Sequence, residues 1–168
     1  MKRIKRHFIK VKEFLKLQQQ LPQQIQQILQ EKVSKKVNVE KVELENFEIY
    51  LVDGKPILVK IEEKIFPTLI FEDAIKILPK IVVDEGATPY VCRGADVMRP
   101  GIIKIIGDFP QNSFVVVVEE KYQKPIALGL SLHSSQEIWM YERGKMVKNL
   151  HYVGDDVWNF LKNLKLYT

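Results

Sequence analysis

The chain has 168 residues, of which 46% are hydrophobic and 28% are charged. This composition is typical of a folded globular protein, and the length allows one domain or two small ones. No apolar run approaches the roughly 20 residues of a membrane helix, and no apolar segment of a secretory signal follows the basic N-terminus. Cys92 is the single cysteine, so an internal disulfide is excluded and we expect a cytoplasmic protein.

The formal net charge of +5 is unevenly distributed along the chain. Residues 1–36 contain ten lysines and arginines against Glu13 and Glu31, a balance of +8, so residues 37–168 carry the remaining −3. A basic segment of this kind is more often a solvated tail than a ligand site. Because the rest of the chain has no excess of positive charge, any nucleic-acid site must depend on local residues.

The N-terminal region has the pattern of helices. Apolar residues recur at spacings of three and four over residues 8–33, which predicts a helical region. Pro22 interrupts the pattern and favours two helices, about 8–20 and 22–34, over one. The glutamines between Gln18 and Gln30 leave this period intact, so we interpret them as a polar helix face and not as a low-complexity segment.

A change of period to two then predicts a small antiparallel sheet. Apolar and polar residues alternate over residues 37–44, and a strand is expected at 47–52. Asp53-Gly54 is a strong hairpin signal, with residues 56–62 as the returning strand. A further extended piece is expected at 66–70.

The C-terminal part of the chain is predicted to be rich in short strands. Residues 72–78 form a short helix with acids in its first turn, stopped before Pro79. The continuous apolar run 114–118 predicts a central strand covered on both sides. Many short strands with few helices predict a small closed barrel. The predicted strands are 81–83, 90–92, 102–106, 113–119, 126–130, 145–147 and 151–153, with a helical turn from Ser134 and a last one capped by Asp155-Asp156.

The segment 83–102 has the composition of a binding loop. Gly94-Ala95 offers backbone with little side chain, which lets a partner approach closely. Pro100-Gly101 has the composition of a type II turn. Arg93 and Arg99 suit phosphate or carboxylate.

No catalytic machinery is visible in the sequence. The three histidines lie far apart and share no motif with Cys92, so we expect neither a metal site nor a cofactor. Cys92 is interpreted as a buried inert thiol and not as a nucleophile. Adjacent acids such as Glu119-Glu120 point to opposite faces of a strand, and no phosphate loop or dinucleotide fingerprint is present. The sequence therefore predicts a protein that is not an enzyme.

Three segments together resemble a known RNA-binding module. Residues 93–102 (RGADVMRPGI), the upstream segment 83–87 (VDEGA) and the downstream run 126–129 (IALG) resemble a PUA domain, the barrel named after pseudouridine synthases and archaeosine transglycosylases. Residues 66–69 (FPTL) and 149–158 (NLHYVGDDVW) further resemble the malignant T-cell-amplified sequence family, which has archaeal relatives. The sequence motifs resemble the family over residues 66–158, whereas residues 1–65 resemble it only in their expected arrangement of helices and sheet.

The resemblance implies an α+β fold with two domains. Residues 1–71 would form a pre-PUA domain of helices against an antiparallel sheet, and residues 72–168 a PUA pseudo-barrel of mixed strands with short helices. Such proteins are non-catalytic, bind structured RNA (rRNA or tRNA) and are connected with translation. In eukaryotes they pair with the density-regulated protein and act on the small ribosomal subunit, so we expect partners of this kind and no membrane.

The resemblance also implies an RNA groove bordered by the helix 72–78. Its Gly94-Ala95 turn would admit a sugar-phosphate backbone, its arginines would bind phosphate, and Tyr90 would stack a base. Other roles stay open for these residues: Tyr90, Val97 and Met98 in the core, Gly94 in a bulge, or Arg99 paired with Asp96. The expected RNA-binding residues are Lys80, Tyr90, Arg93, Gly94, Ala95, Met98, Arg99, Pro100 and Gly101.

Two other functions remain open on the sequence alone. One is a protein-interaction module in which RNA contact is incidental, and the other is the RNA-targeting subunit of a modification system whose catalytic subunit is a separate chain. The absence of excess positive charge in residues 37–168 keeps the first of these open, because avid nonspecific RNA binding depends on cations.

Overall fold

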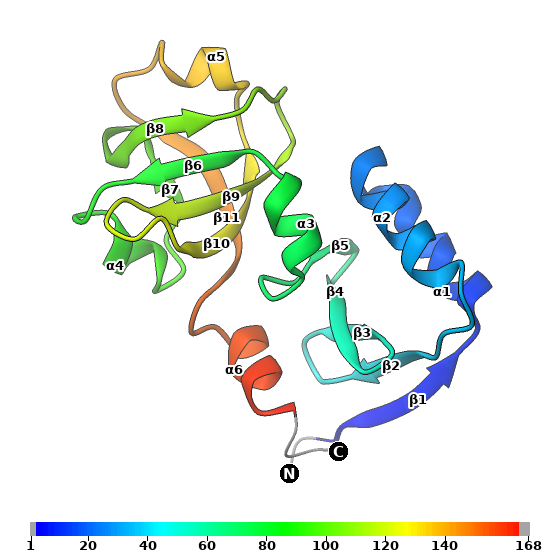
Figure 1. Ribbon diagram of the computed structural model, residues 1–168. Coiled ribbons are helices and arrows are strands. Elements are labelled where there is room, and N and C mark those ends of the chain that lie inside the picture. Colours follow the sequence, from blue (N-terminus) through cyan, green and yellow to red (C-terminus); the bar gives the residue numbers. More distant parts are fainter. Residues whose placement is uncertain (1–2, 165–168) are drawn as a thin grey trace. The chain divides into compact units, whose positions relative to one another are not determined.

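The computed structural model describes residues 3–164 and contains two β-sheets, each in its own compact unit (Figure 1). Contacts within the chain divide between Ile77 and Leu78, whereas the sequence suggests a second domain that begins at residue 72. Lys2 of the basic segment lies outside the described residues. Two separate sheets with short helices confirm the predicted α+β class.

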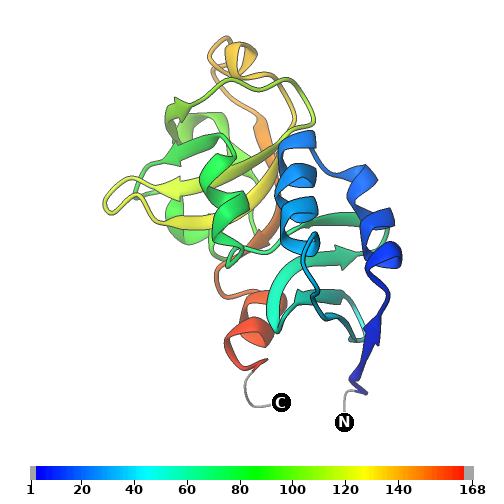
Figure 2. The same cartoon turned by 45° about the vertical axis from the view of Figure 1, so that its right-hand side comes forward.

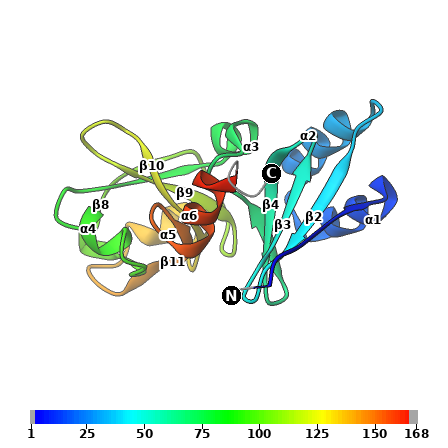
Figure 3. The same ribbon diagram turned by 90° about the horizontal axis from the view of Figure 1, so that it is seen from below.

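The first unit is a five-stranded antiparallel sheet with helices along one face (Figures 2 and 3). The strand order is β1-β2-β3-β4-β5, and each neighbouring pair is antiparallel. In chain order the elements are β1 (Lys5–Ile9), α1 (Val11–Leu17), η1 (Gln18–Gln20), α2 (Gln23–Val33), β2 (Val39–Glu43), β3 (Glu48–Val52), β4 (Lys55–Ile61), β5 (Lys64–Pro67) and α3 (Glu72–Ile77).

The two predicted N-terminal helices are present and are separated at Pro22, which precedes the first residue of α2. Ile25 and Leu29 lie four positions apart on α2 and are fully buried, as the apolar period predicts. Phe14 of α1 is buried, and its ring centroid lies 6.3 Å from that of Tyr50 in the sheet. Most of the glutamines lie on the exposed side of η1 and α2, which confirms their interpretation as a polar face.

The predicted start of the first helix at residue 8 is wrong. Residues 5–9 form the edge strand β1, in register with β2 from Lys5 opposite Glu43 to Ile9 opposite Val39. Phe8, which completed the helical period in the sequence, is exposed. The error has a physical cause, because the partner of β1 lies some thirty residues later and no local pattern reports such pairing.

The hairpin predicted at Asp53-Gly54 is confirmed. Asp53 has φ of 49° and Gly54 has φ of 78°, the two positive values that a type I′ turn requires. Asp53 further accepts a hydrogen bond at Oδ1 from the backbone N–H of Asn38 (2.9 Å), which ties the turn to the start of β2. Local turn chemistry therefore sets the register of β3 and β4.

The second unit is a six-stranded mixed sheet with the order β7-β11-β10-β9-β6-β8. The β6–β9 pair is parallel and the other pairs are antiparallel. Strand β9 is central and Val115 to Val118 are all buried, as predicted. The elements are β6 (Lys80–Val83), α4 (Thr88–Val91), β7 (Val97–Met98), η2 (Arg99–Gly101), β8 (Ile102–Ile106), β9 (Phe114–Glu119), β10 (Pro125–Ser131), α5 (Ser135–Ile138), β11 (Lys145–Tyr152) and α6 (Asp156–Lys162).

The two edge strands of this sheet, β7 and β8, are consecutive in the chain and are joined by η2. Three residues span at most about 10 Å, so the two edges must lie close together and the sheet curls into the expected pseudo-barrel (Figure 1). The backbone N–H of Arg99 donates to Gly144 O (2.8 Å) and that of Asp84 donates to Gly101 O (2.9 Å). We call η2 with these two hydrogen bonds the barrel seam.

Three further local predictions are wrong. Residues 90–92 do not form a strand, because Pro89 lies in the first turn of α4, where its missing N–H is not needed. Pro100-Gly101 is part of the 3₁₀ helix η2, and the φ of Gly101 is not positive, so no type II turn forms. The two closing strands are one continuous strand, β11.

The predicted helix starts near the C-terminal end are confirmed by their caps. Ser134 accepts a hydrogen bond from the N–H of Glu137 at the start of α5. Asp155 accepts one from the N–H of Trp158 (2.7 Å) at the start of α6. None of the helices within residues 3–164 has the length and apolar character needed to cross a membrane.

Candidate functional site

A pocket of about 270 Å³ opens between α4 and β7 in the second unit. Tyr90 and Met98 are 64% and 45% exposed, so they form its rim, whereas Val91 and Val97 are buried and form its floor. Met98 is therefore not a core residue, and neither is Tyr90. The lining residues are Ala87, Tyr90, Val91, Ala95, Asp96, Val97, Met98 and Gly101, of which the sequence predicted Tyr90, Ala95, Met98 and Gly101 as site residues.

The chain reaches this geometry through a capped helical turn followed by a reversal. Asp84 accepts the N–H of Ala87 at Oδ1 (2.8 Å), and its carbonyl accepts the hydroxyl of Thr88 (3.0 Å), which fixes the start of α4. After α4, Gly94 has φ of +98°, a conformation that favours glycine. The N–H of Ala95 then donates to Tyr90 O (3.0 Å), and the chain turns into β7.

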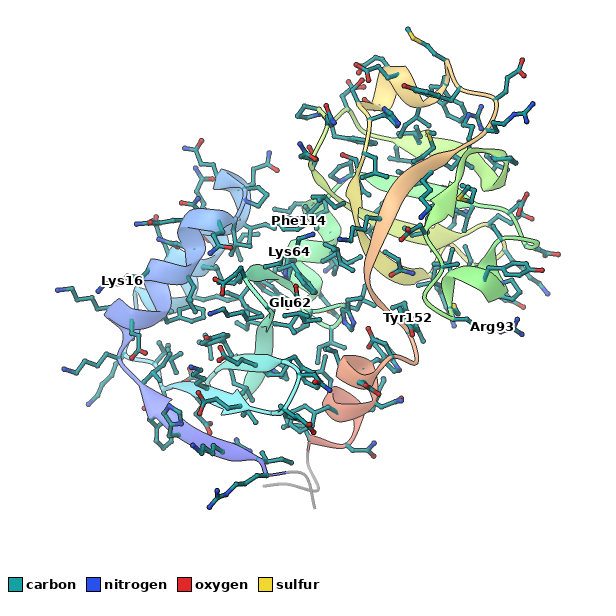
Figure 4. The ribbon with its side chains drawn as sticks, turned by 180° about the vertical axis from the view of Figure 1, so that it is seen from behind. Lys16, Glu62, Lys64, Arg93, Phe114 and Tyr152 are labelled. Carbon is teal, nitrogen blue, oxygen red and sulfur yellow. The ribbon has the colours of Figure 1, made fainter. Side chains whose placement is uncertain are left out.

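The space around residue 94 also requires a glycine. A Cβ atom at this position would lie 3.1 Å from Cε1 and 3.2 Å from Oη of Tyr152, at the end of β11. Figure 4 shows Tyr152 beside the turn that carries Arg93. Gly94 lies outside the strands, so it belongs to a turn after a helix and not to a β-bulge. The backbone here is open to solvent on its outer side, since Arg93, Gly94 and Ala95 are all exposed.

Asn149 of β11 holds the turn in place; the sequence placed it in the family motif 149–158 but did not predict it as a site residue. Its side-chain amide donates to Val91 O (3.1 Å) and to Ala95 O (3.0 Å). Its backbone N–H donates to Asp96 Oδ1 (2.9 Å), and Asp96 Oδ2 lies 3.4 Å from the ammonium group of Lys145. One side chain therefore joins both ends of the pocket-forming turn to the sheet.

Arg99 does not pair with Asp96, because Lys145 occupies that position. The Arg99 guanidinium instead lies over the ring of Trp139, 4.7 Å from its centroid, and its Nη1 donates to Ile102 O (3.3 Å). Pro100 is exposed in η2 between Arg99 and the pocket residue Gly101. Trp139 was not predicted as a site residue, because it lies far from Arg99 in the chain and no motif joins the two.

Lys80 lies apart from the pocket. It pairs with Ile106 at the start of β6, whereas Val83 at the other end of that strand pairs with Ile102 next to the seam. Its ammonium group donates to Leu78 O (2.7 Å), and burial lowers its pKa. Likewise, the helix that lines the pocket is α4, and not the predicted helix at residues 72–78, which packs against α2 in the first unit.

The remaining titratable candidates have structural surroundings. Burial raises the pKa of the half-buried Cys92 thiol, which disfavours the nucleophilic thiolate. His151 is fully buried, with Nδ1 2.8 Å from Oδ2 of the capping residue Asp155. Among residues 3–164 no cluster of three or more histidine, cysteine, aspartate or glutamate side chains is arranged to hold a metal ion.

Comparison with known proteins identifies the family of the chain. The PUA domain family model matches residues 79–153, and a family described as a domain of unknown function (DUF1947) matches residues 5–71. An uncharacterized protein of Methanocaldococcus jannaschii is 40% identical over 159 residues, which cover 93% of this chain and 96% of the relative. The chain belongs to the PUA-domain family.

The PUA protein also has eukaryotic relatives, one of which is named after the translation machinery. Translation machinery-associated protein 20 of Saccharomyces cerevisiae is 28% identical over 86% of this chain and 84% of its own length. Malignant T-cell-amplified sequence 1 of Rattus norvegicus is 29% identical over 68% of this chain and 66% of its own. These relatives confirm the family that the sequence motifs indicate.

Solved structures show the same two-part fold. A hypothetical protein from the hyperthermophilic archaeon Pyrococcus horikoshii matches with a TM-score of 0.73 and 34% identity, over 94% of this chain and 99% of the other. A PUA-domain protein of Aeropyrum pernix, solved with tartrate, matches with a TM-score of 0.77 over 96% of this chain and 92% of the other. At 24% identity the second likeness shows the fold alone.

Proposed function

We propose that this PUA protein is a non-catalytic RNA-binding protein related to translation, and that RNA binds at the α4–β7 pocket and the adjoining turn. The observation that carries the proposal is the pairing of an apolar pocket, rimmed by Tyr90 and Met98, with a bare turn that exposes Arg93 beside Gly94. Unpaired RNA bases need an apolar or aromatic surface, and the backbone that carries them needs cations and room.

The pocket suits one unpaired base. Its volume of about 270 Å³ lies just below the roughly 300–1,000 Å³ of pockets that hold drug-sized ligands, which fits a single planar ring system. The exposed ring of Tyr90 offers a stacking face at the rim, and the floor is aliphatic. Asp96 contributes a carboxylate to the lining, and a base edge that carries an amino group would complement it.

The adjoining turn suits the sugar-phosphate backbone. Gly94 and Ala95 present little side chain, and Arg93 is exposed next to them, so a phosphate is able to approach the backbone and receive a two-point contact from the guanidinium. Because residues 37–168 carry a formal charge of −3, this local cation matters more than the overall surface.

The relatives supply the biological setting of the proposal. The name of translation machinery-associated protein 20 links that relative to the translation machinery, so we expect the RNA to be structured RNA of that machinery, rRNA or tRNA. The small ribosomal subunit and a protein similar to the density-regulated protein are the expected partners, and the cytoplasm is the expected location.

The proposal is tested with single substitutions and a matched control. Replacing Tyr90 with alanine removes the stacking face, and we expect affinity for a tRNA transcript or a small-subunit rRNA fragment to fall about tenfold, since one stacked base contributes roughly 1–3 kcal/mol. Tyr122→Ala is the control, because Tyr122 is 65% exposed in the same unit but lies outside the pocket. Fluorescence anisotropy of labelled RNA measures both.

Two outcomes would contradict the proposal. If Tyr90→Ala and Arg93→Ala bind both RNAs as tightly as the parent, the site lies elsewhere. If the parent binds neither RNA but retains a protein partner from extract, the chain is a protein-interaction module.

A further inference from the structure

The turn that follows α5 exposes three consecutive apolar residues, Trp139, Met140 and Tyr141. Trp139 is 46% exposed and Met140 more so. Ile138, directly before them, is fully buried and anchors the turn to the core. A contiguous exposed group of this kind marks a contact surface more often than an isolated apolar residue does.

The aromatic rings of this turn are held in fixed positions. The Arg99 guanidinium lies over Trp139, and the ring of His133 lies 4.4 Å from that of Tyr141, centroid to centroid, at 35° between planes. The N–H of Met140 donates to Glu137 O (2.9 Å), which closes the backbone of the turn. Rings fixed in advance lose little conformational entropy when a ligand stacks on them.

The turn is continuous with the proposed RNA pocket through the barrel seam. Met98 lines the pocket and pairs with Lys145 across the sheet. Arg99, the next residue, contacts Trp139 with its side chain and Gly144 with its backbone N–H. A chain that leaves the pocket over Met98 therefore reaches Trp139 by way of Arg99.

Two arginines, Arg99 and Arg143, lie beside this path. Arg143 and Lys145 are exposed next to the turn, whereas Arg99 is partly buried against Trp139. Asp96 lies 3.4 Å from the ammonium group of Lys145 and pairs with it, so Arg99 and Arg143 are the cations of this path that stay available to a phosphate. Aromatic rings with arginines beside them form the stacking surfaces of proteins that bind single-stranded nucleic acid.

We propose that Trp139 and Tyr141 are a second contact for RNA, on which unpaired bases stack after the strand leaves the pocket and crosses the barrel seam. This inference rests on the proposed function of the pocket and narrows its ligand to RNA with a single-stranded extension. Tryptophan, tyrosine, methionine and arginine are also enriched in protein interfaces, so a protein occupant is the competing outcome of the test.

The test uses the fluorescence of Trp139 itself. The chain has two tryptophans, and Trp158→Phe leaves Trp139 as the single one. RNA hairpins that carry 5′ or 3′ single-stranded extensions of increasing length are titrated into this variant. We expect short extensions to bind without a change in emission and longer ones to quench it, because only the longer strands reach the turn.

Affinity supplies the second readout. In the parent we expect affinity to rise with extension length. In Trp139→Ala we expect the affinity for long extensions to be about tenfold lower than in the parent, and the affinity for short extensions to be unchanged. Trp139→Phe retains a ring and should retain most of the gain, which separates stacking from a folding defect. Tyr122→Ala changes an exposed aromatic that does not line the pocket and should behave as the parent.

The inference and the proposed function fail in different ways. An equal gain with length in the parent and in Trp139→Ala, no gain in the parent, or no quenching by any RNA would overturn the second contact. Quenching by a protein from extract without quenching by RNA would overturn it as well. If Tyr90→Ala does not weaken the binding of hairpins with short extensions, the proposed binding pocket is wrong instead.

Discussion

At the scale of single residues, Gly94 carries the strictest requirement in the site. Its φ of +98° disfavours any side chain, and the ring of Tyr152 fills the space that a Cβ would occupy. Gly154 has nearly the same φ, +99°, but nothing lies within 4 Å of a Cβ placed there. The two glycines therefore separate the cost of the backbone conformation from the cost of the contact.

We predict that Gly94→Ala destabilises the protein more than Gly154→Ala. The second change costs about 1–2 kcal/mol, the penalty of the left-handed conformation alone. The first adds the contact with Tyr152, and in a Tyr152→Ala background the two costs should become equal. Urea unfolding of the four variants measures these differences, and equal costs in the parent background would show that the Tyr152 ring moves aside freely.

At the scale of elements, the β9–β10 turn is organised by a single carboxylate. Glu119 accepts the backbone N–H groups of Lys121 (2.7 Å), Tyr122 (2.9 Å) and Lys124 (2.9 Å). These hydrogen bonds, that from Lys124 first, lower the pKa of Glu119 below its ordinary value. The turn also has Gln123 in the left-handed region, with φ of 56°.

The turn should therefore open in acid. Because the folded pKa is depressed, the contribution of Glu119 is complete above the ordinary glutamate pKa near 4.5 and is lost as the pH falls through the lowered folded value. Amide chemical shifts of Lys121, Tyr122 and Lys124 followed by NMR should move together in that window. Glu119→Ala should remove this common transition at every pH, and its persistence would assign it to another group.

The elements that the sequence predicts correctly are those with local causes. Asp53-Gly54 specifies its hairpin through its own backbone preferences, and the apolar run of β9 reports its burial on both sides. Strand β1 was missed because its partner β2 lies beyond two helices. The helix α4 was missed because the apolar residues at 90–92 outweighed Pro89, whose position in a first helical turn was the available signal.

The candidate site was predictable only where one segment supplies it. The residues of the Gly94 turn and Met98 could be named because they follow one another in the chain. Asn149 and Trp139 reach the same site from other elements, and no spacing in the sequence joins them to Gly94 or Arg99. The sequence therefore shows which residues have suitable chemistry but not which distant residues meet in the fold.

At the scale of the whole molecule, the distribution of charge separates two sources of RNA affinity. The basic excess lies in residues 1–36, where side chains such as Lys16 of α1 are exposed (Figure 4). The proposed RNA path in the second unit has its own exposed cations, Arg93, Arg143 and Lys145. Salt dependence counts the phosphates that a protein neutralises, so it distinguishes the two sources.

We predict a shallow salt dependence that belongs to the second unit. Three phosphate contacts to a single strand give a slope of log affinity against log salt of about −2. Combined replacement of Lys10, Lys12 and Lys16 by glutamine should leave this slope unchanged, and Arg93→Gln should reduce it by somewhat less than one. A steep slope that becomes shallower in the triple variant would assign the phosphate contacts to the basic residues 1–36.

The barrel seam has a thermodynamic consequence for the protein. The pocket residues from Ala87 to Gly101 lie in one continuous stretch between β6 and β8, and hydrogen bonds to Gly144 and to Asn149 of the neighbouring strand β11 give that stretch its shape. If the barrel seam opened, the same residues would be present but would no longer form the pocket. Ligand affinity and barrel closure are therefore linked by mass action, so each increase in affinity for the closed form is also an increase in its stability against opening.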